Sequence, residues 1–265
     1  MPIRSHLQRL GRRLTAPQRP LPSFVVIGAM RSGTTSLFDY LSQHPHVDPP
    51  TRKEIHYFDL HYERGLNWYR AFFPWGRPGV ISGEASPSYL TVPSVPERLA
   101  ATLPDAKLIV SLRDPAQRAV SHHSLRTKLG YEHRSLDEAL ADELSRIDRE
   151  GQSLPDIVTR VTDIDYLVAG HYAEQLEAWF AHFRRSQFLI VDAHDLFADA
   201  GRVYERALRF LGLDAHEPPS FDQLNTGGDR SFGPDTERML AEYYADHNRA
   251  LVALLGQPMS WTGGS

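Results

Sequence analysis

The sequence predicts a single α/β domain in which a central parallel sheet is flanked by helices on both faces. Short apolar runs typical of buried strands alternate with helical patterns between residues 24 and 255. A glycine-bounded loop joins the first apolar run to the first helical pattern, as in strand–loop–helix units that bind phosphate. The 265 residues are enough for one large core, and no internal repeat divides them.

The predicted elements follow one another in regular order. The strands are four apolar runs, at residues 24–28, 79–83, 107–112 and 187–192. Helices are predicted at residues 34–43, 94–102, 115–128 and 170–184. A last helix is predicted over 234–255, because Pro234 suits a first helical turn directly after Gly233. Residues 131–169 have mixed charge and weak periodicity, so the sequence leaves their shape open.

The segment 24–37, FVVIGAMRSGTTSL, predicts a P-loop-like phosphate-binding loop. Gly28 and Gly33 enclose four residues, as in loops where backbone N–H groups and the positive end of a helix meet a phosphate. Thr34 stands where the Walker lysine is expected, and the cation of the loop, Arg31, lies three residues earlier. The hydroxyls of Thr34 and of the next threonine still offer donors for one phosphate group. The loop therefore predicts a nucleotide ligand other than a triphosphate.

A second motif, LIVSLRDPAQRAVS at residues 108–121, predicts a site for a second phosphate. Pro115 suits the first turn of a helix, so Arg113 lies at the carboxyl end of a strand and Ser121 about two turns into the helix. An arginine offers a fork for bidentate phosphate binding, and the serine adds a donor. Two separate phosphate sites imply a doubly phosphorylated nucleotide.

Together the two motifs resemble those of sulfotransferases that use 3′-phosphoadenosine-5′-phosphosulfate (PAPS), closest to the heparan sulfate N- and O-sulfotransferase branch and its bacterial relatives. The resemblance runs from about residue 23 to residue 255 and includes KEIHYFD at 53–59, GLNWY at 65–69 and SPSY at 86–89. It implies a sulfotransferase domain over residues 23–265. The implied reaction moves a sulfuryl group from PAPS to a hydroxyl or amine of a small-molecule, glycan or lipid acceptor, without a metal.

The resemblance assigns the first loop to the 5′-phosphosulfate and the second motif to the 3′-phosphate. The cofactor-binding residues expected on this basis are Arg31, Ser32, Gly33, Thr34, Thr35, Ser36, Arg113, Ser121 and Arg230. Arg230 lies in the segment 227–233, which stands where relatives have a disulfide-closed loop over the 3′-phosphate. Phe232 of that segment is a candidate to contact adenine, and a plain flexible loop is the alternative interpretation.

Glu54, His56 and Asp59 are the candidates for a general base. Glu54 and His56 are two residues apart, so an extended segment would direct both side chains to one face. The resemblance matches Glu54 to the glutamate taken as the base and the other two to its neighbours. Arg31, the cation of the phosphate loop, is expected to stabilise the charge that develops on the leaving 5′-phosphate, which makes it a further candidate catalytic residue. The alternatives, in which His56 is the base or only orients Glu54, stay open.

Ala85 occupies a position at which the relatives closest to the heparan enzymes carry a lysine. One cation for the sulfate or the acceptor is therefore missing, unless Arg52 or Lys53 replaces it. Two other functions fit the phosphate loops. A P-loop-type small-molecule kinase needs the Walker lysine that Thr34 replaces, and a non-catalytic nucleotide-binding protein has no use for an intact Glu54–His56 pair.

Composition excludes several classes of function. The formal net charge of −4 does not suggest a nucleic-acid partner. The absence of cysteine excludes disulfides, thiolate catalysis and cysteine-ligated metals, and the 13 histidines follow no metal-ligand spacing, so no metal is expected. No apolar run approaches the roughly 20 residues that cross a bilayer. Because the Golgi members of the resembled family are membrane-anchored, the resemblance then implies a bacterial, cytoplasmic relative.

Residues 1–22 form a basic N-terminal arm, since no acidic residue precedes Asp39. A short apolar stripe among its arginines fits peripheral contact of residues 1–16 with the inner face of a membrane. A solvated or subunit-packed arm is the alternative, and the oligomeric state stays open. Four aromatic residues would suit a sugar ring or a lipid at the acceptor site, with core packing as the alternative: Tyr57, Trp68, Tyr69 and Tyr89.

Overall fold

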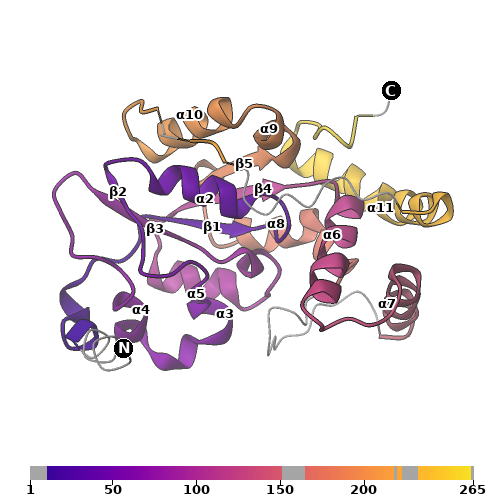
Figure 1. Cartoon of the computed structure of the whole chain (residues 1–265), viewed down its shortest axis with the longest axis horizontal. Coiled ribbons are helices and arrows are strands. Elements are labelled where there is room, and N and C mark those ends of the chain that lie inside the picture. Colours follow the sequence, from indigo (N-terminus) through magenta and orange to yellow (C-terminus); the bar gives the residue numbers. More distant parts are fainter. Residues whose placement is uncertain (1–10, 151–164, 218–219, 223–231, 264–265) are drawn as a thin grey trace.

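The computed structural model describes residues 11–150, 165–217, 220–222 and 232–263 (Figure 1). Its centre is a five-stranded parallel sheet with the strand order β2-β3-β1-β4-β5. The strands are β1 (Phe24–Gly28), β2 (Val47–Asp48), β3 (Ile81–Ala85), β4 (Lys107–Leu112) and β5 (Phe188–Asp192). The predicted fold class is confirmed.

Helices cover both faces of the sheet (Figure 1). One face packs against α2 (Thr34–Ser42) and α10 (Ala200–Leu211), with the short α9 (Ala193–Ala198) before α10, and the other packs against α5 (Val95–Thr102) and α8 (Tyr172–Phe180). Three further helices gather beyond the carboxyl ends of the strands: α6 (Pro115–Lys128), α7 (Leu136–Glu150) and α11 (Pro234–Leu255). The connection between β2 and β3 contains α3 (Tyr57–Leu60) and α4 (Leu66–Arg70).

Strand β1 is buried on both faces, as expected for the central strand of a parallel sheet. Its successive side chains point to opposite faces, so Phe24 and Val26 join the core under α2 and α10. Val25 and Ile27 join the core under α5 and α8. The continuous apolar run that predicted this strand therefore reflects burial on both sides.

The strand order places a topological switch point at β1. The chain forms β2 and β3 on one side of β1 and then crosses to form β4 and β5 on the other. Ligands of open parallel sheets bind outside the carboxyl ends of the strands at such a point. The loop after β1 and the turn after β4 therefore lie at the same edge of the sheet.

Two predicted boundaries differ from the structure for local reasons. β3 begins at Ile81 rather than at residue 79, because Gly79 has a φ of 73° and the Val80 N–H donates to the Arg77 carbonyl in a turn at 3.1 Å. The helix predicted over 170–184 is shorter in the structure. α8 begins at Tyr172, because a 3₁₀ turn at Val168–Gly170 precedes it, and it ends at Phe180. The region left open, 131–169, contains α7.

The described part of the N-terminal arm packs on the domain. Arg12 Nε donates to the carbonyl of Ala71 at 2.8 Å, and Arg19 Nη1 donates to that of Phe73 at 2.8 Å. Ala16 is fully buried. Residues 11–22 are therefore held by backbone acceptors of the domain, whereas residues 1–10 lie outside the described residues. Within the described ranges, every helix is too short or too polar to span a bilayer.

Gly83 offers a test of the packing between β3 and β1. A Cβ added at this residue would lie 2.1 Å from Phe24 Cζ, inside the closed core. We expect Gly83→Ala to lower the free energy of unfolding by about 1–3 kcal/mol, the usual cost of overpacking. Urea denaturation measures this change. Gly11→Ala is the control, because a Cβ there meets no atom within 4 Å; equal effects of the two changes would contradict the packing.

Candidate active site

The loop after β1 is fixed to the end of β4. Ala29 N–H donates to the Ser111 carbonyl at 2.7 Å, and Ser111 Oγ donates to the Ser32 carbonyl at 2.6 Å. Gly33 has a φ of 78° and precedes α2, and a Cβ at this position would lie 2.9 Å from Leu196 Cδ2. Ser111, which the sequence analysis did not single out, thus holds the loop at the start of α2.

The same loop has the features of an anion site. The buried hydroxyl of Ser32 faces the hydroxyl of Tyr172 and forms no well-aligned hydrogen bond within the described part of the chain. Arg31 has a φ of 68°, an uncommon left-handed conformation that in proteins clusters at functional sites. Thr34 and Thr35 form the first turn of α2, at the positive end of the helix. The loop therefore fits a phosphate group.

The second phosphate motif lies where the sequence predicts it. Arg113 follows β4 directly, and its carbonyl accepts the hydroxyl of Tyr172 at 2.9 Å. Asp114 caps α6 by accepting two backbone N–H groups. Ser121 lies two turns into α6 and accepts Arg31 Nε–H at 3.1 Å. The two predicted motifs are therefore in direct contact.

The candidate bases form a chain of polar contacts beside the loop. Glu54 Oε1 lies 2.7 Å from Lys53 Nζ, and Glu54 Oε2 lies 3.8 Å from His56 Nε2. The other ring nitrogen, His56 Nδ1, lies 3.0 Å from Asp59 Oδ2. Ser88 Oγ donates to the same Asp59 oxygen at 2.5 Å. Asp59 thus holds His56, which in turn faces Glu54.

The backbone that carries this chain is not the extended segment predicted from the sequence. Glu54 has a φ of 57° and His56 a φ of 55°, both left-handed. Glu54 N–H donates to the Ala85 carbonyl at 3.0 Å, and Ile55 is buried in the core between the two site residues. The two side chains still face each other. With Arg31, three expected catalytic residues have strained φ angles, which the surrounding contacts hold in place.

Charges fix the protonation states of the pair. The imidazolium of His56 and the ammonium of Lys53 outweigh burial and lower the pKa of Glu54 to about 2. Burial alone would lower the pKa of His56, but hydrogen bonding with Asp59 and interaction with Glu54 raise it to about 9. At neutral pH Glu54 is therefore a carboxylate and His56 a cation, so Glu54 is the member of the pair that can accept a proton.

A buried hydrogen-bond network packs against the Glu54–His56–Asp59 contacts on their core side. Tyr69 Oη donates to Glu84 Oε1 at 3.0 Å, and burial raises the pKa of Glu84 to about 8. Tyr89 Oη accepts the N–H groups of Tyr57 and Phe58, at 2.9 and 3.3 Å, directly after His56. These three tyrosines are buried, so they position the site and offer no surface to an acceptor. For these three tyrosines the interpretation as core-packing residues is confirmed.

Two expected contacts of the 227–233 segment have different outcomes. Arg230 lies outside the described residues, so its role at the 3′-phosphate stays a prediction. Phe232 is described and packs against the core formed by α6, α7 and α11. Thr35, in contrast, has a partner that the sequence did not indicate, because its hydroxyl accepts from Lys53 Nζ at 3.0 Å.

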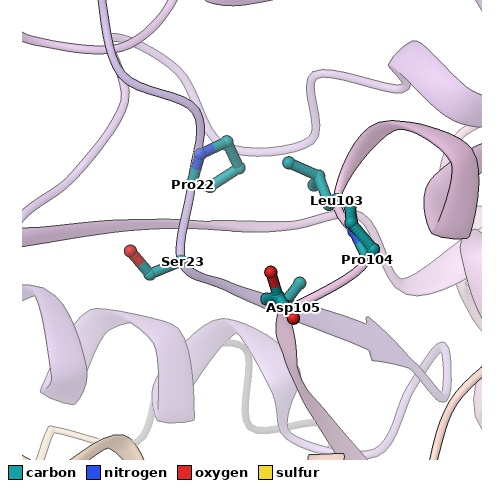
Figure 2. Close-up of a pocket in the computed structure, with 6 residues that line it drawn as sticks. Pro22, Ser23, Leu103, Pro104 and Asp105 are labelled. Carbon is teal, nitrogen blue, oxygen red and sulfur yellow. The ribbon is translucent and has the colours of Figure 1, made fainter.

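A pocket of about 310 Å³ lies away from these motifs (Figure 2). It is lined by segments that precede β1 and β4, whereas the phosphate motifs follow these strands. Its lining residues include Asp105 and no Lys or Arg, so the pocket does not suit a phosphorylated nucleotide: Pro22, Ser23, Leu103, Pro104, Asp105 and Ala106.

Among the residues that the structure describes, one group of possible metal ligands lies where the start of α8 meets α11. Ligand atoms of His171, Glu174 and His247 lie within 4.8 Å of one another. These groups already contact one another or a neighbouring side chain. His247 Nδ1 is 2.8 Å from Glu174 Oε1, and His171 Nε2 is 2.8 Å from Tyr243 Oη. The absence of a metal site stays a prediction.

Comparison with known proteins identifies similar sequences among sulfotransferases. The model of the Sulfotransferase domain family matches residues 21–225. The mouse bifunctional heparan sulfate N-deacetylase/N-sulfotransferase 4 is 34% identical over 91% of this chain, which spans only 31% of that protein. The human heparan sulfate glucosamine 3-O-sulfotransferase 6 is 31% identical over 92% of this chain and 75% of its own length.

Solved structures show the same fold. A sulfotransferase from Alicyclobacillus acidocaldarius superposes with a TM-score of 0.77 at 28% identity, covering 92% of this chain and 99% of its own. The mouse sulfotransferase SULT7A1 complexed with PAP superposes with a TM-score of 0.56 at 13% identity, covering 91% and 88%. This second likeness shows the fold alone.

The raised pKa of His56 predicts a pH-dependent stability. Because folding raises this pKa from 6.5 to about 9, the stabilisation is complete below pH 6.5 and is lost as the pH rises through 9. His56→Asn should therefore lower the free energy of unfolding more at pH 6 than at pH 9.5, with a difference on the order of 2–3 kcal/mol. Urea unfolding at both pH values measures the difference. His194→Asn, at a largely exposed site, is the control, and the same pH dependence in both variants would contradict the assignment.

Proposed function

This chain belongs to the sulfotransferase domain family, and on that premise we propose that it transfers a sulfuryl group from PAPS to a hydroxyl or amine of an acceptor. The observation that carries the proposal is the placing of an ionised Glu54 beside the phosphate loop, joined to Thr35 through Lys53. We propose a carbohydrate, glycolipid or secondary metabolite as the acceptor, since the relatives named above are heparan sulfate sulfotransferases.

The two contacting motifs would hold the two ends of the nucleotide. The backbone N–H groups of the loop, with Arg31, Thr34 and Thr35, suit the 5′ end, and Arg113 with Ser121 suits the 3′-phosphate. When bound, PAPS supplies a sulfuryl group activated by its phosphate leaving group. Arg31 then stabilises the negative charge that develops on that phosphate as the sulfur–oxygen bond breaks.

Glu54 accepts the proton of the acceptor hydroxyl or amine. With a pKa of about 2 it is a weak base in the free protein, because two cations hold its negative charge. An anion bound in the adjacent loop repels the carboxylate and competes for Lys53, and both effects raise the pKa of Glu54 toward the useful range. His56, held by Asp59, orients the carboxylate and remains charged.

The 3′-phosphate assignment is tested with Arg113→Ala. We expect this variant to lose about 2–4 kcal/mol of binding free energy for 3′-phosphoadenosine-5′-phosphate (PAP), because a charged partner is left unpaired. Calorimetry without Mg²⁺ measures the loss, and adenosine 5′-phosphosulfate, which lacks the 3′-phosphate, is the matched ligand. Equal losses for both ligands would mean that Arg113 supports only the fold.

The base assignment and the reaction are tested with Glu54→Gln. Mass spectrometry of a glycan, glycolipid and metabolite panel incubated with PAPS should show a sulfated product for the wild type. Glu54→Gln keeps the shape of the side chain and removes its basicity, so we expect kcat to fall about 10²- to 10⁴-fold with PAP affinity retained. We expect His56→Asn to lower kcat less than Glu54→Gln does, because Glu54 is still present to accept the proton.

The pH profile separates the two possible bases. With Glu54 as the base and His56 as a cation, kcat/KM should be level between pH 6 and pH 8 and fall as the pH passes about 9. A kcat/KM that rises toward pH 9, together with an active Glu54→Gln and an inactive His56→Asn, would assign the base to His56 instead.

A further inference from the structure

Lys53 is a candidate to replace two lysines that this sequence lacks at its phosphate loop and at residue 85. Thr34 replaces the lysine of a Walker loop, and Ala85 replaces the lysine of the heparan-type relatives. Lys53 Nζ lies 3.0 Å from Thr35 Oγ1 and 2.7 Å from Glu54 Oε1. We propose that Lys53 is a ligand of the 5′-phosphosulfate and connects that group to Glu54. This inference rests on the proposed function and names a further residue of the same site.

The electrostatics of α2 support an anionic ligand beside Lys53. Thr35 lies in the first turn of this nine-residue helix, where the helix dipole disfavours a cation. Arg31 adds a second cation close to the same end, since it precedes α2 by three residues. Glu54 offsets part of this positive charge, but its side chain is 46% exposed and it also faces His56. A phosphosulfate group would bring negative charge to the ammonium of Lys53 and to the positive end of α2.

Geometry distinguishes Lys53 from its neighbour Arg52. The guanidinium of Arg52 donates to the backbone carbonyl of Glu54 through Nε at 3.3 Å and Nη2 at 2.9 Å, and its side chain is exposed. Lys53 points to the loop, with its side chain 24% exposed. An ammonium group has three donors, and the hydroxyl of Thr35 and the carboxylate of Glu54 take two of them. With these two acceptors within the described part of the chain, the third donor is available to a phosphate oxygen.

The position of Lys53 couples the loop to the base. In the free protein its charge is shared between Thr35 and Glu54. A bound anion at the start of α2 draws this charge toward the loop and weakens its hold on the carboxylate. Binding of the sulfuryl donor thus makes Glu54 more basic through one side chain.

The binding test uses a double-mutant cycle with PAP as the probe. Lys53→Met should weaken PAP binding about tenfold by calorimetry in the wild type, and at least as much in the Glu54→Gln background, where Lys53 is no longer shared with a carboxylate. If Lys53 acts only by holding Glu54, its removal changes nothing once Glu54 is Gln, and the inference is overturned. Lys128→Met, at the exposed last residue of α6, is the control for the loss of one positive charge and should bind as the wild type does. A wild type that does not bind PAP would instead overturn the proposed function.

Chemical rescue tests whether the charge of Lys53 is what matters. The chain has no cysteine, so Lys53→Cys introduces a single thiol that 2-bromoethylamine converts to a lysine analogue on the folded protein. We expect Lys53→Cys to lose about tenfold in PAP affinity and the aminoethylated protein to return to within about threefold of the wild type. Alkylation of the same thiol with iodoacetamide adds a neutral group and should leave the loss in place. Equal affinities for the two alkylated proteins would contradict a role for the cation.

Discussion

The parallel pairing of β1 with β4 is the constraint on which the site depends. Both strands end at the same edge of the sheet, so the loop after β1 and the turn after β4 lie together. Ser111 fastens the loop to β4, and Arg31 donates to Ser121 across the two motifs. The Arg31–Ser121 contact joins residues 90 positions apart, so the two predicted phosphate motifs lie together at one edge of the sheet.

The chemistry depends on a line of alternating charges beside that site. Buried Asp59 keeps His56 protonated, His56 with Lys53 keeps Glu54 ionised, and Lys53 also contacts the loop. The line reaches from the core to the start of α2. A change of charge in the loop therefore affects Glu54 through two contacts, Thr35–Lys53 and Lys53–Glu54. In the proposed reaction, nucleotide binding would then precede the activation of Glu54.

Much of the fold follows from the sequence because local signals agree with the packing. Asp114 and Pro115 begin α6 at the predicted residue, and Gly256 ends α11 in the left-handed conformation. α10 was not predicted, although the sequence carries its signals: Asp199 caps its first turn, Gly212 ends it in the left-handed conformation and its apolar residues face the sheet. β2, at two residues, is too short to show a pattern.

The sequence predicts residues for the candidate site but not their geometry. Motif spacing indicates Arg31, Arg113 and Ser121, but nothing in the sequence near Glu54 and His56 signals a left-handed backbone. The contact between Lys53 and Thr35 joins residues 18 positions apart, so it depends on tertiary packing.

The most direct test of this account is a crystal structure of the complex with PAP. The account predicts the 5′-phosphate at the start of α2, within hydrogen-bond distance of the loop N–H groups and Thr35, and the 3′-phosphate at Arg113 and Ser121. A nucleotide bound elsewhere, or a 3′-phosphate that does not contact Arg113, would contradict it.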